Sequence, residues 1–245
     1  MKLALIGNGA MGRLVAARAR EEGHEVGAVV GSREAGLSAA ELAGVLRGHD
    51  AAVDFTVAEA VARNAEACAL ARVPLVEGTT GWHAQLEGVR RAVEREGGAL
   101  IHGANFSVGV QIFYRVAARA AELLAAFDYE PFIEEAHHSR KRDAPSGTAL
   151  RLRELVAAEF GRDFSVASTR AGHIPGTHRV GFDSAADQIT LTHAARSREG
   201  FAAGALVAAR WIRGRQGVYE FSETFDEILK DVGHHVSGGG GQAGS

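Results

Sequence analysis

The chain has 245 residues, of which 46% are hydrophobic and 23% are charged, and its formal net charge at pH 7 is -3. Such a composition is typical of a globular protein with one large or two modest domains. The weak negative charge gives no electrostatic basis for binding nucleic acid, and no run of about 18 apolar residues predicts a membrane span. The single cysteine, Cys68, has no partner for a disulfide, so we expect a buried residue in a cytoplasmic protein.

Short apolar strands alternate with helices in the first part of the chain. Strands are expected at 2–6, 24–31, 50–56, 73–80 and 98–105, with helices at about 11–22, 38–47, 58–71 and 82–96. This alternation indicates right-handed parallel crossovers, with helices covering both faces of one sheet. The sequence therefore predicts an α/β fold, a Rossmann-type doubly wound parallel sheet, in a dinucleotide-binding domain over residues 1–107.

The pattern changes after residue 107. A helix at about 107–126, a strand within 128–138, a helix over 146–160, two strands at 177–184 and 187–195, and a helix at about 199–213 are expected. The last two strands are predicted to form an antiparallel hairpin. These elements predict a second, α+β domain with a mixed sheet over 108–213. Residues 214–232 are expected to return to the first domain, and the Gly/Ser-rich segment 233–245 to form a flexible tail.

The first predicted strand runs directly into a glycine-rich loop, GNGAMG, in which Gly7, Gly9 and Gly12 have G-x-G-x-x-G spacing. In a dinucleotide-binding loop the first glycine permits a tight turn and the second lets the backbone approach a pyrophosphate. The third lets the helix pack closely on the strand. Because the loop lies between a strand and a helix of an alternating series, the sequence predicts a dinucleotide cofactor.

The end of the second predicted strand bears on the choice between NADPH and NADH. There Ser32 and Arg33 precede Glu34. A hydroxyl and a guanidinium together suit a 2'-phosphate, so we expect a preference for NADPH. The alternative is that Glu34 binds the ribose hydroxyls and that NADH is used.

The fourth and fifth predicted strands end in EGTTGW and HGANFSVG. Ligands of a doubly wound sheet bind outside the carboxyl ends of its strands. We therefore expect four residues of these strand ends to line the nicotinamide end of the cofactor site: Thr79, Thr80, Ala104 and Asn105.

Residues 134–150, EEAHHSRKRDAPSGTAL, concentrate titratable side chains beside a turn and a helix start. Ser146 is placed to cap this helix, whose free N–H groups would attract an anion. Asp143 either forms the turn with its own backbone or orients Lys141. Because adjacent histidines usually point apart and no cysteine or acid cluster completes a ligand set, no metal site is predicted.

Four segments together, EAHHSRKRDAPSGTA, GTTGW, ANFSVGV and SREGFAAGAL, strongly resemble the 4-hydroxy-tetrahydrodipicolinate reductase (dihydrodipicolinate reductase) family, over nearly the whole chain to about residue 230. The resemblance implies NAD(P)H-dependent reduction of 4-hydroxy-tetrahydrodipicolinate, via dihydrodipicolinate, to tetrahydrodipicolinate in the diaminopimelate and lysine pathway. It also implies a dicarboxylate substrate and a homotetramer associated through the sheet of the second domain.

The resemblance further implies roles for particular residues. His137 and Lys141 would be catalytic, while His138, Ser146, Gly147 and Thr148 would bind the substrate. The implied cofactor contacts are Gly7, Asn8, Gly9, Ala10, Met11, Gly12, Ser32, Arg33, Gly78, Thr79, Thr80, Gly103, Ala104, Asn105 and Phe106.

The residues alone leave two questions open. Histidine ordinarily titrates near pH 6.5 and lysine near 10.4, so either His137 or Lys141 can supply a proton. The alternative functions are another two-domain Rossmann dehydrogenase, acting on an amino acid or aldehyde, and a non-catalytic nucleotide-binding homologue.

Overall fold

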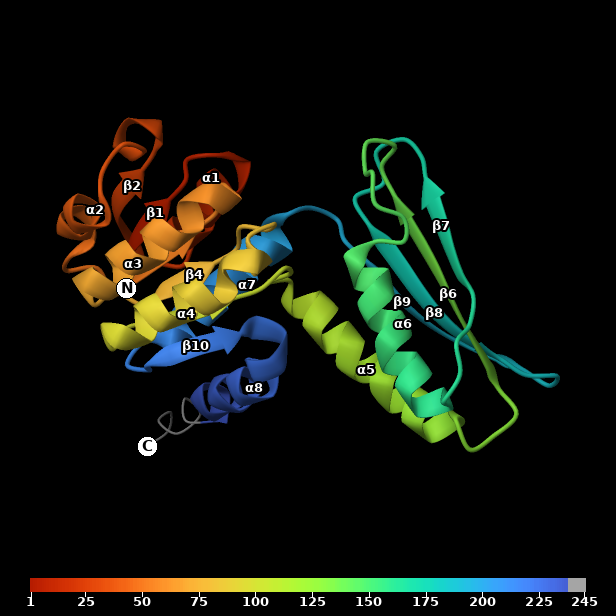
Figure 1. Cartoon of the computed structure of the whole chain (residues 1–245). Helices are drawn as coiled ribbons and strands as arrows, with labels where there is room; N and C mark the ends of the chain where they lie inside the picture. Colours follow the sequence, from red (N-terminus) through yellow and green to blue (C-terminus); the bar gives the residue numbers. More distant parts are fainter. Residues whose placement is uncertain (238–245) are drawn as a thin grey trace, which may run out of the picture. The chain divides into compact units, whose positions relative to one another are not determined.

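The computed structural model describes residues 1–237, and the chain divides into two compact units (Figure 1). Among the described residues, the first unit comprises Met1–Ser107 and the chain from Phe201 to residue 237, and the second comprises Val108–Gly200. None of the described helices combines the length and apolar character that a membrane-spanning helix needs.

The first unit contains a sheet of six parallel strands. These are β1 (Lys2–Ile6), β2 (Glu25–Val30), β3 (Ala51–Asp54), β4 (Leu75–Glu77), β5 (Ala99–His102) and β10 (Gly217–Glu220), in the order β10-β5-β4-β3-β1-β2. Residues of opposite faces, such as Leu5 and Ile6, are both buried. This confirms the predicted Rossmann-type sheet covered on both faces.

The α-helices described in the first unit are predicted by the apolar periodicity of the sequence, except the last one, at residues 221–237. They are α1 (Ala10–Glu21), α2 (Ala39–Leu46), α3 (Val61–Ala71), α4 (Leu86–Arg95), α7 (Glu199–Ile212) and α8 (Phe221–Ser237). Residues Leu42, Val61 and Leu75 belong to one core cluster, which also contains Cys68 at 1% exposure. The expected burial of the cysteine is confirmed.

Helix α7 belongs to the first unit, so the domain boundary predicted at 213 is corrected to 200. The physical reason is a close approach: a Cβ atom at Gly204 would overlap the backbone carbonyl of Phe106. Strand β10 then pairs with β5 and completes the sheet. Helix α8 continues through residue 237, into the segment expected to be a flexible tail, and residues 238–245 lie outside the described residues.

The second unit is built on a four-stranded mixed sheet with the order β7-β6-β8-β9. Its strands are β6 (Glu130–His137), β7 (Val166–Arg170), β8 (Thr177–Asp183) and β9 (Gln188–Ala194). Strand β6 is parallel to β7 and antiparallel to β8, and β8 and β9 form the predicted antiparallel pair. Strand β7 was not predicted.

Two helices cover one face of this sheet, α5 (Val108–Leu124) and α6 (Gly147–Phe160), and α6 is the crossover between the parallel strands β6 and β7 (Figure 1). Phe113 of α5, Leu152 of α6, Ile133 of β6 and Phe182 of β8 are buried together in the core between helices and sheet. Alternate residues of β6 therefore point toward the helices, which fixes the direction of the site residues at its end.

Candidate active site

The glycine loop after β1 has the geometry that a dinucleotide needs. Gly7 has a φ of 100°, and its N–H donates to the Val30 carbonyl at 2.8 Å. A Cβ atom at Gly12 would overlap the Gly7 carbonyl oxygen, whereas a Cβ atom at Gly9 would meet nothing within 4 Å. The loop therefore lets α1 begin directly after β1 and leaves open space at its N-terminus, which fits a pyrophosphate.

The segment after β2 forms one turn of 3-10 helix, Ser32–Glu34. A carboxylate oxygen of Glu34 accepts the Gly31 N–H at 2.7 Å, so this side chain folds back on its own loop. Ser32 and Arg33 are exposed. The Ser32 hydroxyl and the Arg33 guanidinium are thus open to solvent, whereas the Glu34 carboxylate is already hydrogen-bonded to its own loop.

The ends of β4 and β5 lie at the same edge of the sheet as the glycine loop, because all these strands are parallel. A Cβ atom at Gly78 would overlap the Phe55 ring, and the Trp82 indole donates to the Thr79 carbonyl at 2.9 Å. Thr80 and Ala104 are exposed.

The β5 end is fixed by further contacts. A Cβ atom at Gly103 would lie 3.0 Å from that of Phe221, and Phe106 packs on the Phe221 ring at a centroid distance of 4.6 Å. The Asn105 side-chain oxygen accepts the Ser107 N–H at 2.9 Å. The structure therefore brings the predicted cofactor residues of four strand ends to one edge of one sheet.

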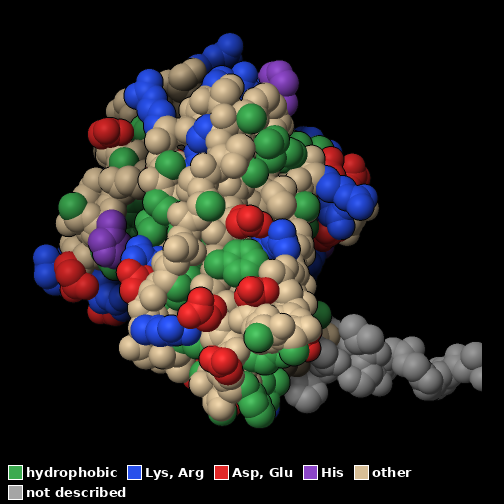
Figure 2. Space-filling view, turned by 90° about the vertical axis from the view of Figure 1, so that its right-hand side faces the viewer, with side chains coloured by type: hydrophobic (Ala, Val, Ile, Leu, Met, Phe, Trp, Pro, Cys, Tyr) green, Lys and Arg blue, Asp and Glu red, His purple; other side chains and the backbone are tan. Residues whose placement is uncertain are grey.

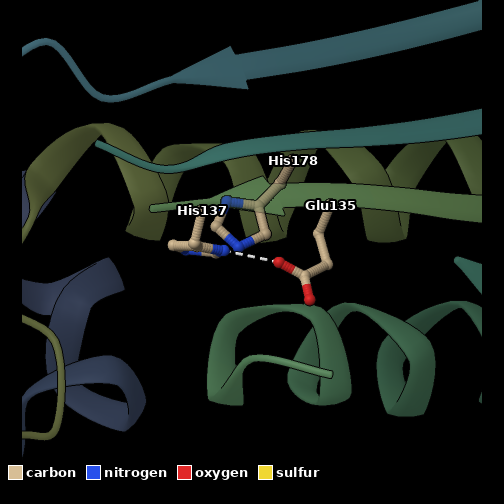
Figure 3. Close-up of side chains that lie close together, drawn as sticks. All are labelled: Glu135, His137 and His178. Atoms are coloured by element: carbon tan, nitrogen blue, oxygen red, sulfur yellow. Dashed lines mark hydrogen bonds and ion pairs between the residues drawn. The ribbon is translucent and has the colours of Figure 1, made fainter. Parts of the chain in front are cut away.

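A buried ionic cluster lies at the end of β6 in the second unit. Glu135 and His137 are two residues apart on the strand and point to the same face, where the His137 Nδ1 lies 2.5 Å from a Glu135 oxygen (Figure 3). The Arg170 guanidinium donates to both Glu135 oxygens, at 2.9 and 2.6 Å. Because an ionised carboxylate only accepts hydrogen bonds, the His137 Nδ1 carries the proton and its Nε2 is an acceptor.

The start of α6 is tied to this cluster through Ser146. Its hydroxyl accepts the Ala149 N–H at 3.2 Å, which caps the helix as predicted, and its own N–H donates to Glu135 at 3.3 Å. The hydroxyl also lies 3.0 Å from the Nε2 of His178, whose ring packs edge-on against that of His137 (Figure 3). Ser146 is only 2% exposed, so its position suits holding the helix start better than contacting a ligand.

Burial and ion pairing set the protonation states of this cluster. Burial opposes ionisation of Glu135, but hydrogen bonds from Arg170, Ser168 and His137 outweigh it and lower the pKa of Glu135 to about 2. Burial lowers the pKa of His137 despite the opposing effect of Glu135. Burial, followed by the neighbouring His137, lowers the pKa of His178 to about 4. Both imidazoles are therefore neutral at pH 7.

The predicted residues Lys141, His138, Gly147 and Thr148 surround the cluster in sequence. The Lys141 ammonium lies 2.8 Å from a carboxylate oxygen of Asp143, so this acid orients the lysine, the less favoured of the two expectations. His138 is half-buried, and its Nδ1 has no hydrogen-bond partner among the described residues. Gly147 is exposed as the first residue of α6.

The sequence analysis did not single out three members of the cluster, Glu135, Arg170 and His178. Glu135 had a signal, since it precedes His137 by two residues on an expected strand. Arg170 had none, because β7 was not predicted. His178 was one of several hairpin histidines with no signal to single it out.

The donor atoms of Glu135, His137 and His178 lie within 4.8 Å of one another, which is close enough to hold a metal ion. However, Arg170 already binds both oxygens of Glu135. A metal would have to displace this guanidinium, so the donor set does not fit a metal.

A doubly wound sheet with a dinucleotide loop, joined to an α+β unit that carries imidazoles, a lysine and an open helix start, defines a class. The class is that of the two-domain, nicotinamide-dependent oxidoreductases. Comparisons with known proteins identify the family within it. The family models described as dihydrodipicolinate reductase, N-terminus and C-terminus, match residues 1–106 and 109–225.

Relatives agree with this match, and solved structures share the fold. The chain is similar to the 4-hydroxy-tetrahydrodipicolinate reductases of Christiangramia forsetii (30% identity) and Archaeoglobus fulgidus (38%), with 94% of this chain and 100% of each relative covered. A dipicolinate-bound dihydrodipicolinate reductase from a Paenisporosarcina species has the same fold, with a TM-score of 0.75 at 21% identity over 91% of this chain and 99% of that one. A probable dehydrogenase from Thermotoga maritima shares it at a TM-score of 0.60, with 9% identity over 94% and 93% of the two chains.

The chain belongs to the dihydrodipicolinate reductase family. It is an oxidoreductase with 4-hydroxy-tetrahydrodipicolinate reductase activity in lysine and diaminopimelate biosynthesis, and this family uses NAD(P)H.

Proposed function

We propose that the second unit binds the substrate as a dianion and carries out its acid–base chemistry with Lys141 as the proton donor and His137 as the proton acceptor. The buried Glu135 supports this division of roles. It accepts a hydrogen bond from His137, and its charge is balanced by Arg170. It holds the imidazole in one tautomer, with Nε2 as the free acceptor.

The substrate class that we propose is a planar ring with two carboxylates. The start of α6, where Gly147 is exposed and Thr148 is half-buried, offers the positive end of a helix dipole to one carboxylate. The unpartnered Nδ1 of His138 and the Lys141 ammonium are suited to the second carboxylate and the ring. The dipicolinate-bound state of the Paenisporosarcina relative supports a ligand of this kind.

Loss of water from the hydroxylated substrate gives a conjugated C=C–C=N unit. NAD(P)H supplies the hydride that reduces this unit. Addition of the hydride produces an enamine-like anion. This anion then takes a proton from the Lys141 ammonium to give the tetrahydro product. Neutral His137 cannot give this proton at pH 7, but its Nε2 can accept the ring proton lost during dehydration and pass it to the departing hydroxyl group, which leaves as water, so that the imidazole is neutral again before the hydride is added. We therefore favour Lys141 over His137 as the proton donor, the choice that the sequence leaves open.

We also propose that NADPH is preferred to NADH. Support comes from the loop after β2, where Glu34 is engaged by the Gly31 N–H while Ser32 and Arg33 are exposed. An exposed guanidinium beside a hydroxyl suits a 2'-phosphate, whereas a carboxylate that already accepts a backbone hydrogen bond is less available to ribose hydroxyls.

A coupled assay tests both proposals. The aldol condensation product of pyruvate and aspartate semialdehyde is the substrate, and oxidation of NADPH and NADH is followed separately. Lys141→Ala and His137→Gln should each lower kcat by about a hundredfold or more. Arg140→Ala, which removes an exposed neighbouring cation, should leave kcat unchanged. Retained turnover in both site variants would contradict the assigned roles.

The cofactor arm of the assay compares Arg33→Ala with Arg47→Ala, an exposed arginine at the end of α2. Arg33→Ala should raise the KM for NADPH far more than that for NADH, because only NADPH carries the 2'-phosphate. Arg47→Ala should change neither constant. Equal losses for the two cofactors in Arg33→Ala would contradict the NADPH preference.

We propose, finally, that the protein is a homotetramer that associates through the sheet of the second unit. Helices α5 and α6 cover one face of this sheet. The other face carries Phe132, over which the Arg179 guanidinium lies 5.7 Å from the ring centroid, and Arg179 pairs with Glu134 at 3.0 Å. Figure 2 shows the side of the molecule at the right of Figure 1, where hydrophobic, acidic and basic side chains are interspersed. Such a mixed surface suits contact with a second copy of the chain.

A further inference from the structure

Two buried carboxyl groups lie side by side in the first unit, at the strand ends that precede loops proposed to bind the cofactor. Asp54 and Glu77 are the last residues of β3 and β4 and are partners in the parallel register. Both are 0% exposed, and each carboxyl group influences the pKa of the other. Neither forms an ion pair with any basic side chain of the described chain.

The remaining partners of this acid pair are neutral. The Asn64 amide donates to Asp54 at 2.7 Å, and the Thr79 backbone N–H donates to Glu77 at 2.7 Å. One oxygen of each carboxyl group, Oδ1 of Asp54 and Oε2 of Glu77, has no donor among the described residues. A single proton held between the two groups supplies the missing hydrogen, whereas two buried carboxylates would repel each other without compensation.

Burial and mutual repulsion act on both groups in the same direction. Burial raises the pKa of Asp54, and burial together with the charge of Asp54 raises the pKa of Glu77 to about 9. The two groups titrate as a pair. The pair therefore holds one proton at neutral pH and loses it in the alkaline range.

The acid pair connects three of the loops that are proposed to bind the cofactor. On the Asp54 side, the Arg63 guanidinium donates to the Asn64 side-chain oxygen at 2.8 Å and also to the Ala35 carbonyl, directly after the Ser32–Glu34 turn. On the Glu77 side, the pair receives the Thr79 N–H. The Thr79 hydroxyl in turn accepts the Thr56 N–H at 3.0 Å, which joins the ends of β3 and β4.

Phe55, which lies between Asp54 and Thr56, packs closely against the glycine loop. A Cβ atom at Gly7 would lie 2.6 Å from the Phe55 carbonyl oxygen, and one at Gly78 would overlap the Phe55 ring. A change in the separation of Asp54 and Glu77 would therefore be transmitted to the glycine loop and to the loop after β4.

We propose that Asp54 and Glu77 are positioning residues that share one proton, and that this protonated pair holds the strand-end loops in the conformation that binds NAD(P)H, so that cofactor affinity falls when the proton leaves. This inference rests on the proposed placement of the cofactor at these loops. It makes cofactor binding pH-dependent through groups that do not touch the cofactor.

The other groups that face the pair do not titrate in the same range. Helix α3 presents Cys68, whose pKa burial and the pair raise well above its ordinary value. Strand β1 presents the apolar Ile6 in register with Asp54, and β5 presents His102 in register with Glu77. Burial, with Arg90 and His83 contributing, lowers the pKa of His102 to about 4.

The test measures the Kd of NADPH, by its fluorescence on binding, from pH 7 to pH 10 in the full-length protein. In the wild type, the Kd of NADPH should rise about tenfold per pH unit above the pH at which Asp54 and Glu77 lose their shared proton. The reason is that only protein molecules with a protonated pair bind the cofactor. Glu77→Gln, which mimics the neutral acid, should hold Kd constant within about twofold over this range. Glu66→Gln, on the opposite face of α3 beside Arg95, is the matched control and should follow the wild type.

Infrared spectroscopy of the wild type gives a second measurement that does not depend on the folding of a variant. A carbonyl stretch from a protonated carboxyl group should be present at pH 7.5 and should disappear with the same midpoint as the loss of NADPH binding. Absence of this band at pH 7.5, or an unchanged pH dependence of Kd in Glu77→Gln, would overturn the inference.

The outcomes separate this inference from the proposed cofactor site. A wild type that binds NADPH with a constant Kd from pH 7 to pH 10 contradicts the acid pair alone. A wild type that binds no NADPH at any pH contradicts the proposed cofactor site itself.

Discussion

Glu135 fixes the chemistry of the His137 imidazole without contacting a substrate in the proposed mechanism. A Glu135 oxygen accepts a hydrogen bond from the His137 Nδ1 at 2.5 Å. The negative charge of Glu135 is balanced by Arg170 rather than by protonation of the histidine. The imidazole therefore stays neutral and correctly oriented at pH 7. A carboxylate that only orients a histidine has a large effect on catalysis when it is replaced.

Replacement of Glu135 by Gln should lower kcat by about a hundredfold, because the amide no longer fixes the tautomer and leaves Arg170 without its counter-charge. The control is Glu134→Gln, one residue earlier on β6, which points to the opposite face and pairs with the half-exposed Arg179 at 3.0 Å. It should keep kcat within about twofold of the wild type. Steady-state kinetics measure kcat for both variants. Equal losses of kcat in Glu135→Gln and Glu134→Gln would contradict the orienting role of Glu135.

His178 should make the second unit sensitive to acid. Its pKa is about 4 in the folded chain and ordinarily near 6.5, so its contribution to stability is complete above pH 6.5 and is lost as the pH falls to about 4. The loss amounts to about 3 kcal/mol. His178→Gln should flatten this dependence, whereas His173→Gln, at an exposed position, should not.

Native-state hydrogen exchange of the β6 and β8 amides is the suitable measurement. These amides report on the second unit itself, whereas both tryptophans, Trp82 and Trp211, lie in the first unit and would report on that unit instead. Protection in wild type that stays constant between pH 7 and pH 4 would contradict this expectation.

At the scale of single elements, the sequence predicts what is determined locally. The segment from β6 to α6 was predicted because a strand, a turn and the Ser146 cap follow one another along the chain. Strand β7 was not, because its five residues VASTR are mostly exposed and show no apolar alternation. Its position depends on pairing with β6, and with it Arg170 reaches Glu135.

The assignment of α7 failed for a similar reason. Its apolar periodicity predicts a helix but not the surface on which the helix packs. That surface is chosen by Gly204, the position at which a side chain would overlap the Phe106 backbone. Contacts between segments almost a hundred residues apart leave no pattern in either segment alone.

Gly204→Ala should therefore destabilise the first unit by about 1–3 kcal/mol, because the methyl group forces α7 away from the Phe106 segment. Gly44→Ala on α2 is the matched control, since nothing lies within 4 Å of its Cβ position. It should stabilise by about 0.5–1 kcal/mol through helix propensity. Thermal unfolding followed by tryptophan fluorescence compares the two, and an unchanged Tm in Gly204→Ala would contradict the packing argument.

At the scale of the whole molecule, the four-stranded sheet has a face that its own helices do not cover, and the proposed tetramer places it in contact with another copy. Thr192→Lys adds a charge to this face opposite Arg179. The variant should sediment as a smaller species than the wild type, because like charges at an interface repel. Ala158→Lys, which adds the same charge to the exposed side of α6, should sediment like the wild type.

The order of the strands has a consequence for biosynthesis. Strand β10 is the sixth strand of the first sheet, yet it leaves the ribosome more than a hundred residues after its partner β5. The second unit is continuous and can fold while the first still waits for its last strand. During that interval β5 is an apolar edge without its neighbour, the kind of edge that pairs with other chains. Translation to about residue 220 is therefore the step that protects the nascent chain from aggregation.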